Sequence, residues 1–275
     1  MSGFSAQWLA LREPLDAASR APDVGAQLAT ALRGSRPPAS VLQVVDLGAG
    51  TGANLRYVAP LLECAQDWLL VEHDPALLAA LDERLPPWLA AMPLRLQARS
   101  LALDLAGGLA NLPLPTGALL TASALLDLVS EQWLHQLLSR ASAARASVWF
   151  ALTYDGRMQC QPPEPEDAEV QELVNRHQRG DKGFGAALGP LAAARAASML
   201  AGFGYRVHAA FSDWRIGPEA HQLQRVLLEG WYGAACETAP ERTGALRGWL
   251  QRRQVHVDAG GSRLVVGHVD LAGSW

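Results

Sequence analysis

The sequence predicts one α/β domain with a doubly wound, mainly parallel sheet of seven strands. Short apolar runs of β-type residues alternate with helical segments along most of the chain, which is typical of parallel strands joined by helices. A glycine cluster at 48–52 follows the first of these runs. The 275 residues, of which 49% are hydrophobic, can bury one large core, and no long linker divides them.

The first segment, residues 4–33, is predicted to be helical because apolar side chains recur along one side of it. Arg12, Glu13 and Arg20 fall among its polar positions. The prolines of the sequence Arg36-Pro37-Pro38 end this segment, since proline cannot continue a helix. Residues 1–38 are therefore expected to form an N-terminal helical cap on the domain.

The segment 41–152 shows the strand and helix alternation most clearly. Apolar runs predict five strands in it, at 41–45, 68–71, 94–98, 118–122 and 148–152. Amphipathic stretches between these runs predict helices at about 53–64, 75–85 and 131–140. Helical connections between strands favour parallel pairing, because a parallel pair needs a crossover.

After residue 152 the alternation stops. The prolines of TYDGRMQCQPPEPED predict an irregular insertion at 153–189, interrupted by a helix from about 166 to 177 and ending in a glycine-rich loop.

The remaining segment, 190–275, is expected to complete the sheet and to add helices. Pro190 begins a helix that Gly202 and Gly204 end. Further elements are predicted as strands at 205–211 and 264–269 and as helices at about 219–235 and 241–254.

Composition excludes several classes of function. The net charge of −4 and the lack of a basic cluster disfavour a nucleic-acid partner. No apolar stretch is long enough for a membrane span, and the first residues do not form a secretory signal, so a cytoplasmic protein is expected. The three cysteines lie far apart and form no metal-binding motif, and no metal is expected.

The segment 44–53, VVDLGAGTGA, fits the GxGxxG/A pattern that follows a strand in nucleotide-binding domains. Glu72 ends the next strand, 22 residues after Gly50, where a ribose-binding carboxylate belongs. Asp46, two residues before the first glycine, would repel the pyrophosphate of a dinucleotide. It would attract the ammonium and sulfonium groups of S-adenosylmethionine (SAM), so charge favours SAM over NAD.

At these residues the sequence resembles the class I SAM-dependent methyltransferases, whose domain is Rossmann-like. VVDLGAGTG is similar to their first motif, VEHDP to their second, and residues 121–127, TASALLD, to their fourth. The sequence departs from the family at its C-terminal end, because the family usually pairs its last two strands as a near-hairpin, whereas two predicted helices separate them here. The resemblance implies a set of SAM-binding residues: Asp46, Gly48, Ala49, Gly50, Glu72, His73, Asp104, Leu105 and Ser123. Asp104 could instead cap a turn.

Methyl transfer from a sulfonium depends mainly on placing the acceptor atom in line with the methyl group. A base is needed only for a protonated acceptor, and the candidates are Asp127, Asp155 and His177. Asp127 could alternatively cap a helix, and His177 lies on a helical stripe typical of a half-buried structural histidine. The candidate acceptor-binding residues are Trp8, Arg12, Tyr154, Arg179 and Lys182, the last being the chain's single lysine.

The sequence therefore predicts a SAM-dependent methyltransferase that acts on a small molecule; it does not identify the acceptor or the oligomeric state. An NAD-dependent oxidoreductase and a SAM-binding protein without catalysis are the alternatives from other classes. A nucleic-acid or protein methyltransferase is a third alternative. The Asn/Asp-Pro-Pro-aromatic element of adenine and glutamine methylases is absent, because the corresponding residues are ASAL.

Overall fold

The computed structural model describes residues 5–37, 40–93 and 95–275. The start of the predicted helical cap, at 1–4, and Leu94, the start of the third predicted strand, lie outside these residues. The predicted α/β class is confirmed, because one mixed sheet lies at the centre of the fold.

Eight strands form the sheet rather than the predicted seven. Its order is β3-β2-β1-β4-β5-β8-β6, with the short β7 paired to β8. The strands are β1 (Leu42–Leu47), β2 (Gln66–Glu72), β3 (Leu96–Ala102), β4 (Leu119–Ser123), β5 (Ser147–Gln161), β6 (Arg206–Phe211), β7 (Trp214–Ile216) and β8 (Arg263–Ser274). The first five are parallel neighbours in the Rossmann order. The last two predicted strands pair antiparallel even though two helices separate them in sequence.

Ten α-helices occur in the described part of the chain. They are α1 (Ala6–Ser19), α2 (Pro22–Gly34), α3 (Ala53–Leu62), α4 (Pro75–Ala91), α5 (Leu105–Gly108), α6 (Glu131–Ala143), α7 (Asp167–Gln178), α8 (Ala192–Gly202), α9 (His221–Thr238) and α10 (Thr243–Asp258). Side chains cap several of them: Asp74 accepts from the first turn of α4, and Ser130 accepts from Trp133 N in α6. Ser130, and not Asp127, is thus the cap of α6.

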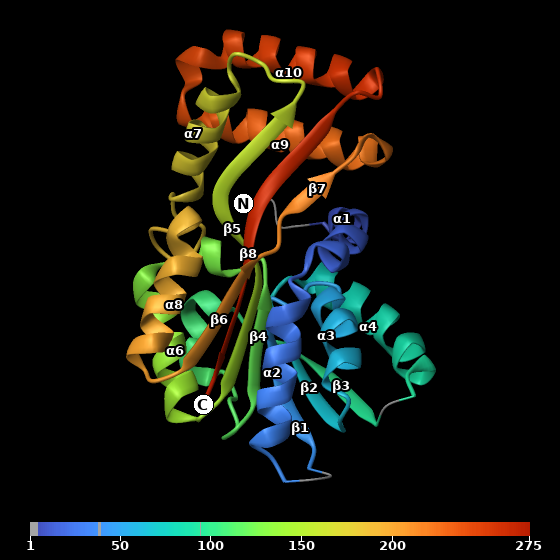
Figure 1. Ribbon diagram of the computed structural model, residues 1–275, viewed down its shortest axis with the longest axis vertical. Helices are drawn as coiled ribbons and strands as arrows, with labels where there is room; N and C mark the ends of the chain where they lie inside the picture. The colour runs from blue at the N-terminus through green and yellow to red at the C-terminus, as the bar shows by residue number, and fades with distance from the viewer. Residues whose placement is uncertain (1–4, 38–39, 94) are drawn as a thin grey trace.

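Two hydrophobic clusters lie on opposite faces of the sheet. Residues of α2, α3 and α4 cover one face around Trp68 and Trp149. Residues of α6 and α8 cover the other face around Phe150 and Leu137. This three-layer arrangement forms the lower body of the molecule in Figure 1.

The prediction of irregular structure directly after residue 152 is wrong. β5 continues to Gln161, and its extension pairs with β8, from Tyr154 opposite His268 to Gln161 opposite Arg263. Register shifts between Phe150 and Thr153 and between Tyr154 and Met158 mark irregularities where the ribbon leaves the body. The prolines act only after residue 161, where they end the strand.

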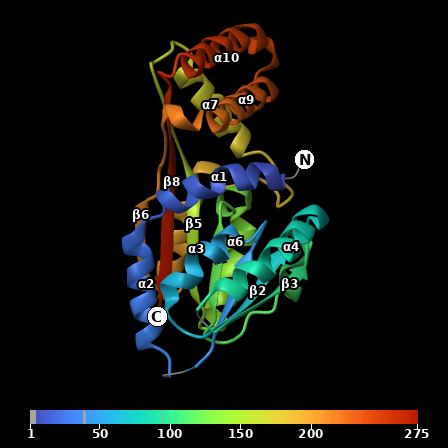
Figure 2. The same ribbon diagram turned by 90° about the vertical axis from the view of Figure 1, so that its right-hand side faces the viewer.

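The β5–β8 ribbon carries a separate unit made of the helices α7, α9 and α10 and the short strand β7 (Figure 1). This unit is the cap, and it is distinct from the N-terminal helices α1 and α2. The cap has its own hydrophobic cluster, which includes Leu173, Trp231 and Trp249. Figure 2 shows α1 lying across the molecule at the junction between the cap and the body. Three apolar residues of α1, Trp8, Leu11 and Leu15, pack against the cap cluster.

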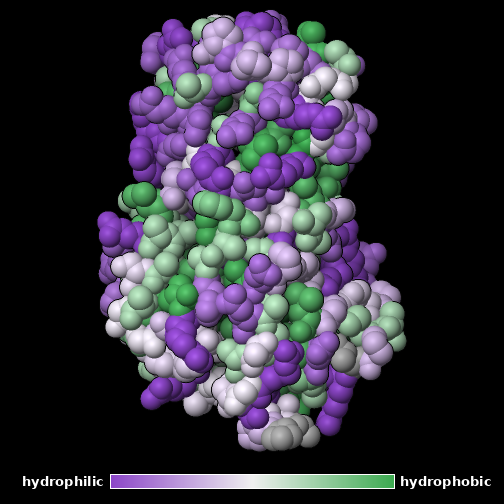
Figure 3. All heavy atoms as spheres, in the orientation of Figure 1, coloured by the Kyte–Doolittle hydropathy of each residue, from purple (hydrophilic) through white to green (hydrophobic). Residues whose placement is uncertain are grey.

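The surface of the cap is mainly hydrophilic over α10, with hydrophobic patches lower on the same face (Figure 3). Within the described residues, no helix combines the length and the apolar character that crossing a membrane requires.

Arg12 and Arg20 are buried, although the sequence placed them among the polar positions of the N-terminal helices. Arg20 stands between α1 and α2 in the sequence, and its Nε lies 3.1 Å from Asp270 Oδ2 on β8. Both side chains are almost fully enclosed. Asp270 also accepts hydrogen bonds from Ala21 N and Leu152 N. This ion pair therefore fixes the N-terminal helices to β8, between β5 and the edge strand β6.

We expect Arg20→Met to lower the free energy of unfolding by about 3–5 kcal/mol, because it leaves the Asp270 carboxylate buried without its charge partner. Arg33→Met is the matched control. It removes an exposed pair with Glu63, in which N and O are 3.7 Å apart, and should change stability by less than about 1 kcal/mol. Urea denaturation measures both variants. Equal effects of the two substitutions would contradict the role of the Arg20–Asp270 pair.

Candidate functional site

The predicted glycine motif forms the turn between β1 and α3. Gly48 and Gly50 adopt φ values of 61° and 55°, in the left-handed region that other residues enter at a cost. A side chain at Gly50 would also approach Leu9 of α1, since an added Cβ would lie 3.0 Å from Leu9 Cδ1. Ala49 between them is buried, and its N–H donates to Val71 O on β2. The backbone is thus open to close approach only because glycines stand here.

Asp46, near the end of β1, is completely buried. Its Oδ1 accepts a hydrogen bond of 2.7 Å from Asn54 Nδ2, whereas its Oδ2 has no partner. Burial raises the pKa of this carboxyl to about 7, and the Asn54 hydrogen bond and the Arg20 charge oppose the shift. An unpartnered carboxylate oxygen in this position suits a cationic donor.

Glu72 ends β2 beside the same turn. Its Oε2 accepts from Gly50 N at 2.9 Å, and its Oε1 accepts from His73 N and Asp74 N. These three bonds leave a lone-pair site of the carboxylate available. The side chain of His73 is mostly exposed, with Nδ1 3.3 Å from Glu72 Oε1. The carboxylate therefore shapes the glycine turn and retains the capacity to accept another hydrogen bond.

The predictions missed a buried polar network behind Asp46. Asn54 Nδ2 also donates to Thr121 Oγ1, and Asn54 Oδ1 accepts from Arg20 Nη1. Asn54 stands in the helix that follows the glycine turn, so its position was a possible signal, but Arg20 is distant in sequence. The network connects the glycine turn to the Arg20–Asp270 ion pair.

Helix α1 closes over the glycine turn through a second ion pair. Arg56 of α3 pairs with Glu13 of α1 at 2.6 Å, and its Nη1 donates to Thr51 O in the turn. Leu9 contacts Gly50 from the same helix. The N-terminal helix is therefore linked through Arg56 to the turn that it covers.

The remaining predicted cofactor residues lie at the ends of β3 and β4. Asp104 is exposed and caps α5 by accepting from Ala106 N. Leu105 is buried, and its carbonyl accepts from Trp133 Nε1. Ser123 ends β4 and is partly exposed. Asp104 therefore acts as a cap, which was the alternative interpretation of this residue, and the Asp104 carboxylate is exposed to solvent.

Three of the predicted acceptor-side residues come together beyond β4, at the base of the cap. Asp127 is buried, and burial raises its pKa to about 6, with the Arg12 charge opposing. The Tyr154 hydroxyl donates to Asn175 Oδ1 at 2.7 Å, and burial and the charges of Asp155 and Asp127 raise its pKa. Arg12 pairs with Asp16 at 2.8 Å.

Aromatic side chains border these groups. The Arg12 guanidinium lies 5.5 Å from the ring centre of Trp214. Trp8 is partly buried against the cap cluster. The junction therefore combines aromatic surface with a few buried polar groups, which is typical of small-molecule sites.

The structure places the other four predicted residues elsewhere. Asp155 points away from Tyr154 and forms an ion pair with Arg157 at 2.6 Å. His177 Nε2 lies 2.9 Å from Glu237 Oε2, and Lys182 Nζ lies 3.2 Å from His177 Nδ1. Arg179 is exposed. His177 and Lys182 are thus engaged with each other, Asp155 is engaged with Arg157, and Arg179 faces solvent.

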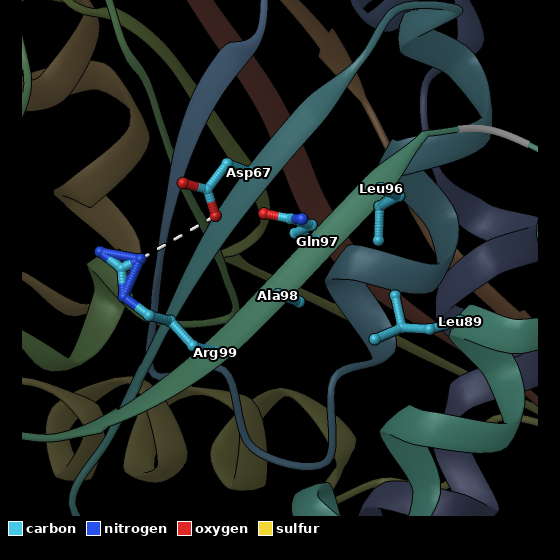
Figure 4. Close-up of a pocket in the computed structure, with 6 residues that line it drawn as sticks. All are labelled: Asp67, Leu89, Leu96, Gln97, Ala98 and Arg99. Carbon is cyan, nitrogen blue, oxygen red and sulfur yellow. Dashed lines mark ion pairs between the residues drawn. The ribbon is translucent and has the colours of Figure 1, made fainter.

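A shallow hollow of about 460 Å³ lies at the outer edge of the sheet (Figure 4). It is lined by Asp67, Leu89, Leu96, Gln97, Ala98 and Arg99. Leu89 stands on α4, and the other five residues stand in the amino-terminal parts of β2 and β3. The hollow is therefore opposite the glycine turn, whereas ligands of such sheets bind at the carboxyl ends. The turn, with its orphaned carboxylate oxygen, is the better candidate. No metal-binding cluster of His, Cys, Asp or Glu occurs in the part of the chain described.

The raised pKa of Asp46 predicts a stability effect with a definite sign. The folded state holds this proton up to about pH 7, while an unfolded chain releases it near 3.8. Stability should therefore fall as pH rises between these values, and Asp46→Asn should remove part of the fall. Urea denaturation at about pH 4 and about pH 8 measures this loss of stability, and Asp82→Asn, at an exposed position, is the control. Parallel pH profiles for wild type and Asp46→Asn would contradict the assignment.

Comparisons with protein-family models and with curated proteins gave no match. The chain is similar to the solved structure of mycolic acid cyclopropane synthase CmaA1 complexed with SAH (TM-score 0.47, 11% identity, 90% of this chain and 82% of that chain). It is similar to the cyclopropane synthase MmaA2 from Mycobacterium tuberculosis (0.45, 12%, 90% and 83%). It is also similar to geranyl diphosphate methyltransferase in complex with GPP and sinefungin (0.41, 13%, 91% and 78%).

Proposed function

We propose that this protein is a SAM-dependent methyltransferase that acts on a small molecule held between the body and the cap. The observation that carries the proposal is the buried Asp46 carboxylate, whose Oδ2 has no partner beside a left-handed glycine turn. SAM carries no phosphate, and its ammonium group can donate a hydrogen bond to this oxygen. The residues present therefore fit this cofactor.

The cofactor end of the site uses charge and backbone shape. Asp46 would hold the amino group of SAM, Gly48 and Gly50 would allow its close approach, and Glu72 would accept from the ribose hydroxyls. When bound, SAM supplies a methyl group on a sulfonium, a good leaving group. Leu9 and the Glu13–Arg56 pair keep α1 over this turn and exclude water from it.

The acceptor end uses orientation and proton placement. Tyr154, Arg12 and the flanking tryptophans would position the acceptor, an effect that can be worth roughly 7–11 kcal/mol of the barrier. With a pKa of about 6, Asp127 is mostly ionised at neutral pH. It is the group best suited to hold a proton released from the acceptor when methylation displaces one.

The oxidoreductase alternative is less well supported. A dinucleotide would bring its pyrophosphate to the turn beside Asp46, where a carboxylate repels it. The two arginines near the turn, Arg20 and Arg56, are already paired with Asp270 and Glu13. β8 is also antiparallel to its neighbours β5 and β6. Calorimetric titration with SAM and with NAD distinguishes the two functions.

We expect Glu72→Ala to weaken SAM binding at least about tenfold, because hydrogen bonds to a charged group are worth roughly 1.5–3 kcal/mol each. Calorimetry measures the affinity, and circular dichroism checks that the variant is folded. Glu83→Ala, an exposed position on α4, is the control and should bind SAM as wild type does. Unchanged affinity in a folded Glu72→Ala protein would refute the ribose assignment.

We also expect that the purified protein does not transfer labelled methyl groups to tRNA, rRNA or duplex DNA. A chain with a net charge of −4 gains no counterion release from a phosphate backbone. Scintillation counting after incubation with methyl-labelled SAM measures transfer. Incorporation at enzymatic rates would overturn the small-molecule assignment.

A further inference from the structure

His268 is a buried histidine that the sequence analysis did not select. It stands on β8 directly opposite Tyr154 of β5, at the base of the ribbon. Its side chain is buried, and its Nδ1 has no hydrogen-bond partner. A buried nitrogen without a partner has lost its hydrogen bonds to water, so a ligand group that bonds it would recover that loss.

Aromatic rings flank this imidazole. The ring centre of Trp214 lies 5.0 Å from that of His268, and the ring centre of Tyr154 lies 6.2 Å from it. Trp214 in turn lies under the Arg12 guanidinium. His268 therefore belongs to the same junction as the acceptor-side residues.

The charges around the junction favour an uncharged ligand. Arg12 is neutralised by Asp16, and the other two basic residues among the acceptor-binding candidates, Arg179 and Lys182, lie elsewhere. Asp213 and Arg157 also act on His268, but they pair with each other at 2.6 Å. An anion would be buried here without a free cation, which is costly.

We propose that His268 accepts a hydrogen bond from the acceptor molecule, and that this acceptor is an uncharged aromatic compound carrying a hydroxyl group. The proposal deepens the proposed function, on which it rests, by naming the substrate class and a further positioning residue. The flanking rings suit a planar ligand.

The protonation state of His268 agrees with this role. Burial and the Arg12 charge lower its pKa to about 3, with Asp213 opposing. The ring is therefore neutral at neutral pH, and a neutral imidazole has one nitrogen that can only accept.

The test uses phenol and its methyl ether anisole as probes, because they share the ring and differ in the donor. Dissociation constants are measured by ligand-observed NMR on the full chain saturated with S-adenosylhomocysteine. Wild type should bind phenol about five to ten times more tightly than anisole, since a site built for a hydroxyl discriminates against its absence. His268→Phe should bring the ratio close to one, and the exposed control His208→Phe should keep it.

A second measurement covers the case in which His268→Phe fails to fold. In wild type labelled with nitrogen-15 histidine, phenol should shift one imidazole resonance that anisole leaves in place. Equal affinities for the two probes, binding of neither, or a preference that survives His268→Phe would overturn the proposal. Calorimetry with SAM separates the outcomes, because the proposed function fails only if SAM does not bind.

Discussion

The buried ion pair between Arg20 and Asp270 is the constraint on which the arrangement of the other parts depends. It joins the α1–α2 junction to β8, and the same aspartate accepts from the backbone of β5. Through Asn54, the arginine also reaches Asp46 at the glycine turn. A buried pair is not in itself strongly stabilising, but loss of one partner is costly. The N-terminal helix, the cofactor turn and the antiparallel strand are therefore held in one relative position.

The second feature of consequence is the length of β5 and β8. A strand pair that stopped at the edge of the body would complete the sheet and no more. The extension from Thr153 to Gln161 instead carries a cap with a separate hydrophobic cluster, and it brings His268, Tyr154 and Trp214 to the base of that cap. The proposed acceptor site thus lies where β5 and β8 pass from the body into the cap. Residues close together in sequence, such as Tyr154 and Asp155, diverge there, because successive side chains of a strand point to opposite faces.

The two ends of the proposed site use different physical means. At the glycine turn, charge and backbone conformation dominate, with Asp46 and Glu72 both buried and oriented by hydrogen bonds. At the junction with the cap, aromatic surface dominates and the charges are paired. Helix α1 belongs to both ends, since Leu9 and Glu13 lie over the turn while Arg12 lies over Trp214. A movement of α1 would therefore open both ends together.

The sequence by itself determined the α/β class, the parallel order of alternating elements and the glycine turn with its two carboxylates. These features are local, because hydrophobic periodicity and glycine spacing act over a few residues. The tertiary structure decided which polar residues are buried. Arg20 and Asp270 are 250 residues apart, and the extension of β5 is stabilised by a strand more than 100 residues later. Neither pairing is visible in the local sequence pattern. The prolines after Gln161 therefore led to a prediction of irregular structure from residue 153 on, although the strand continues to Gln161. His268 was missed for the same reason, since its partners come from three separate segments that only the folded chain brings together.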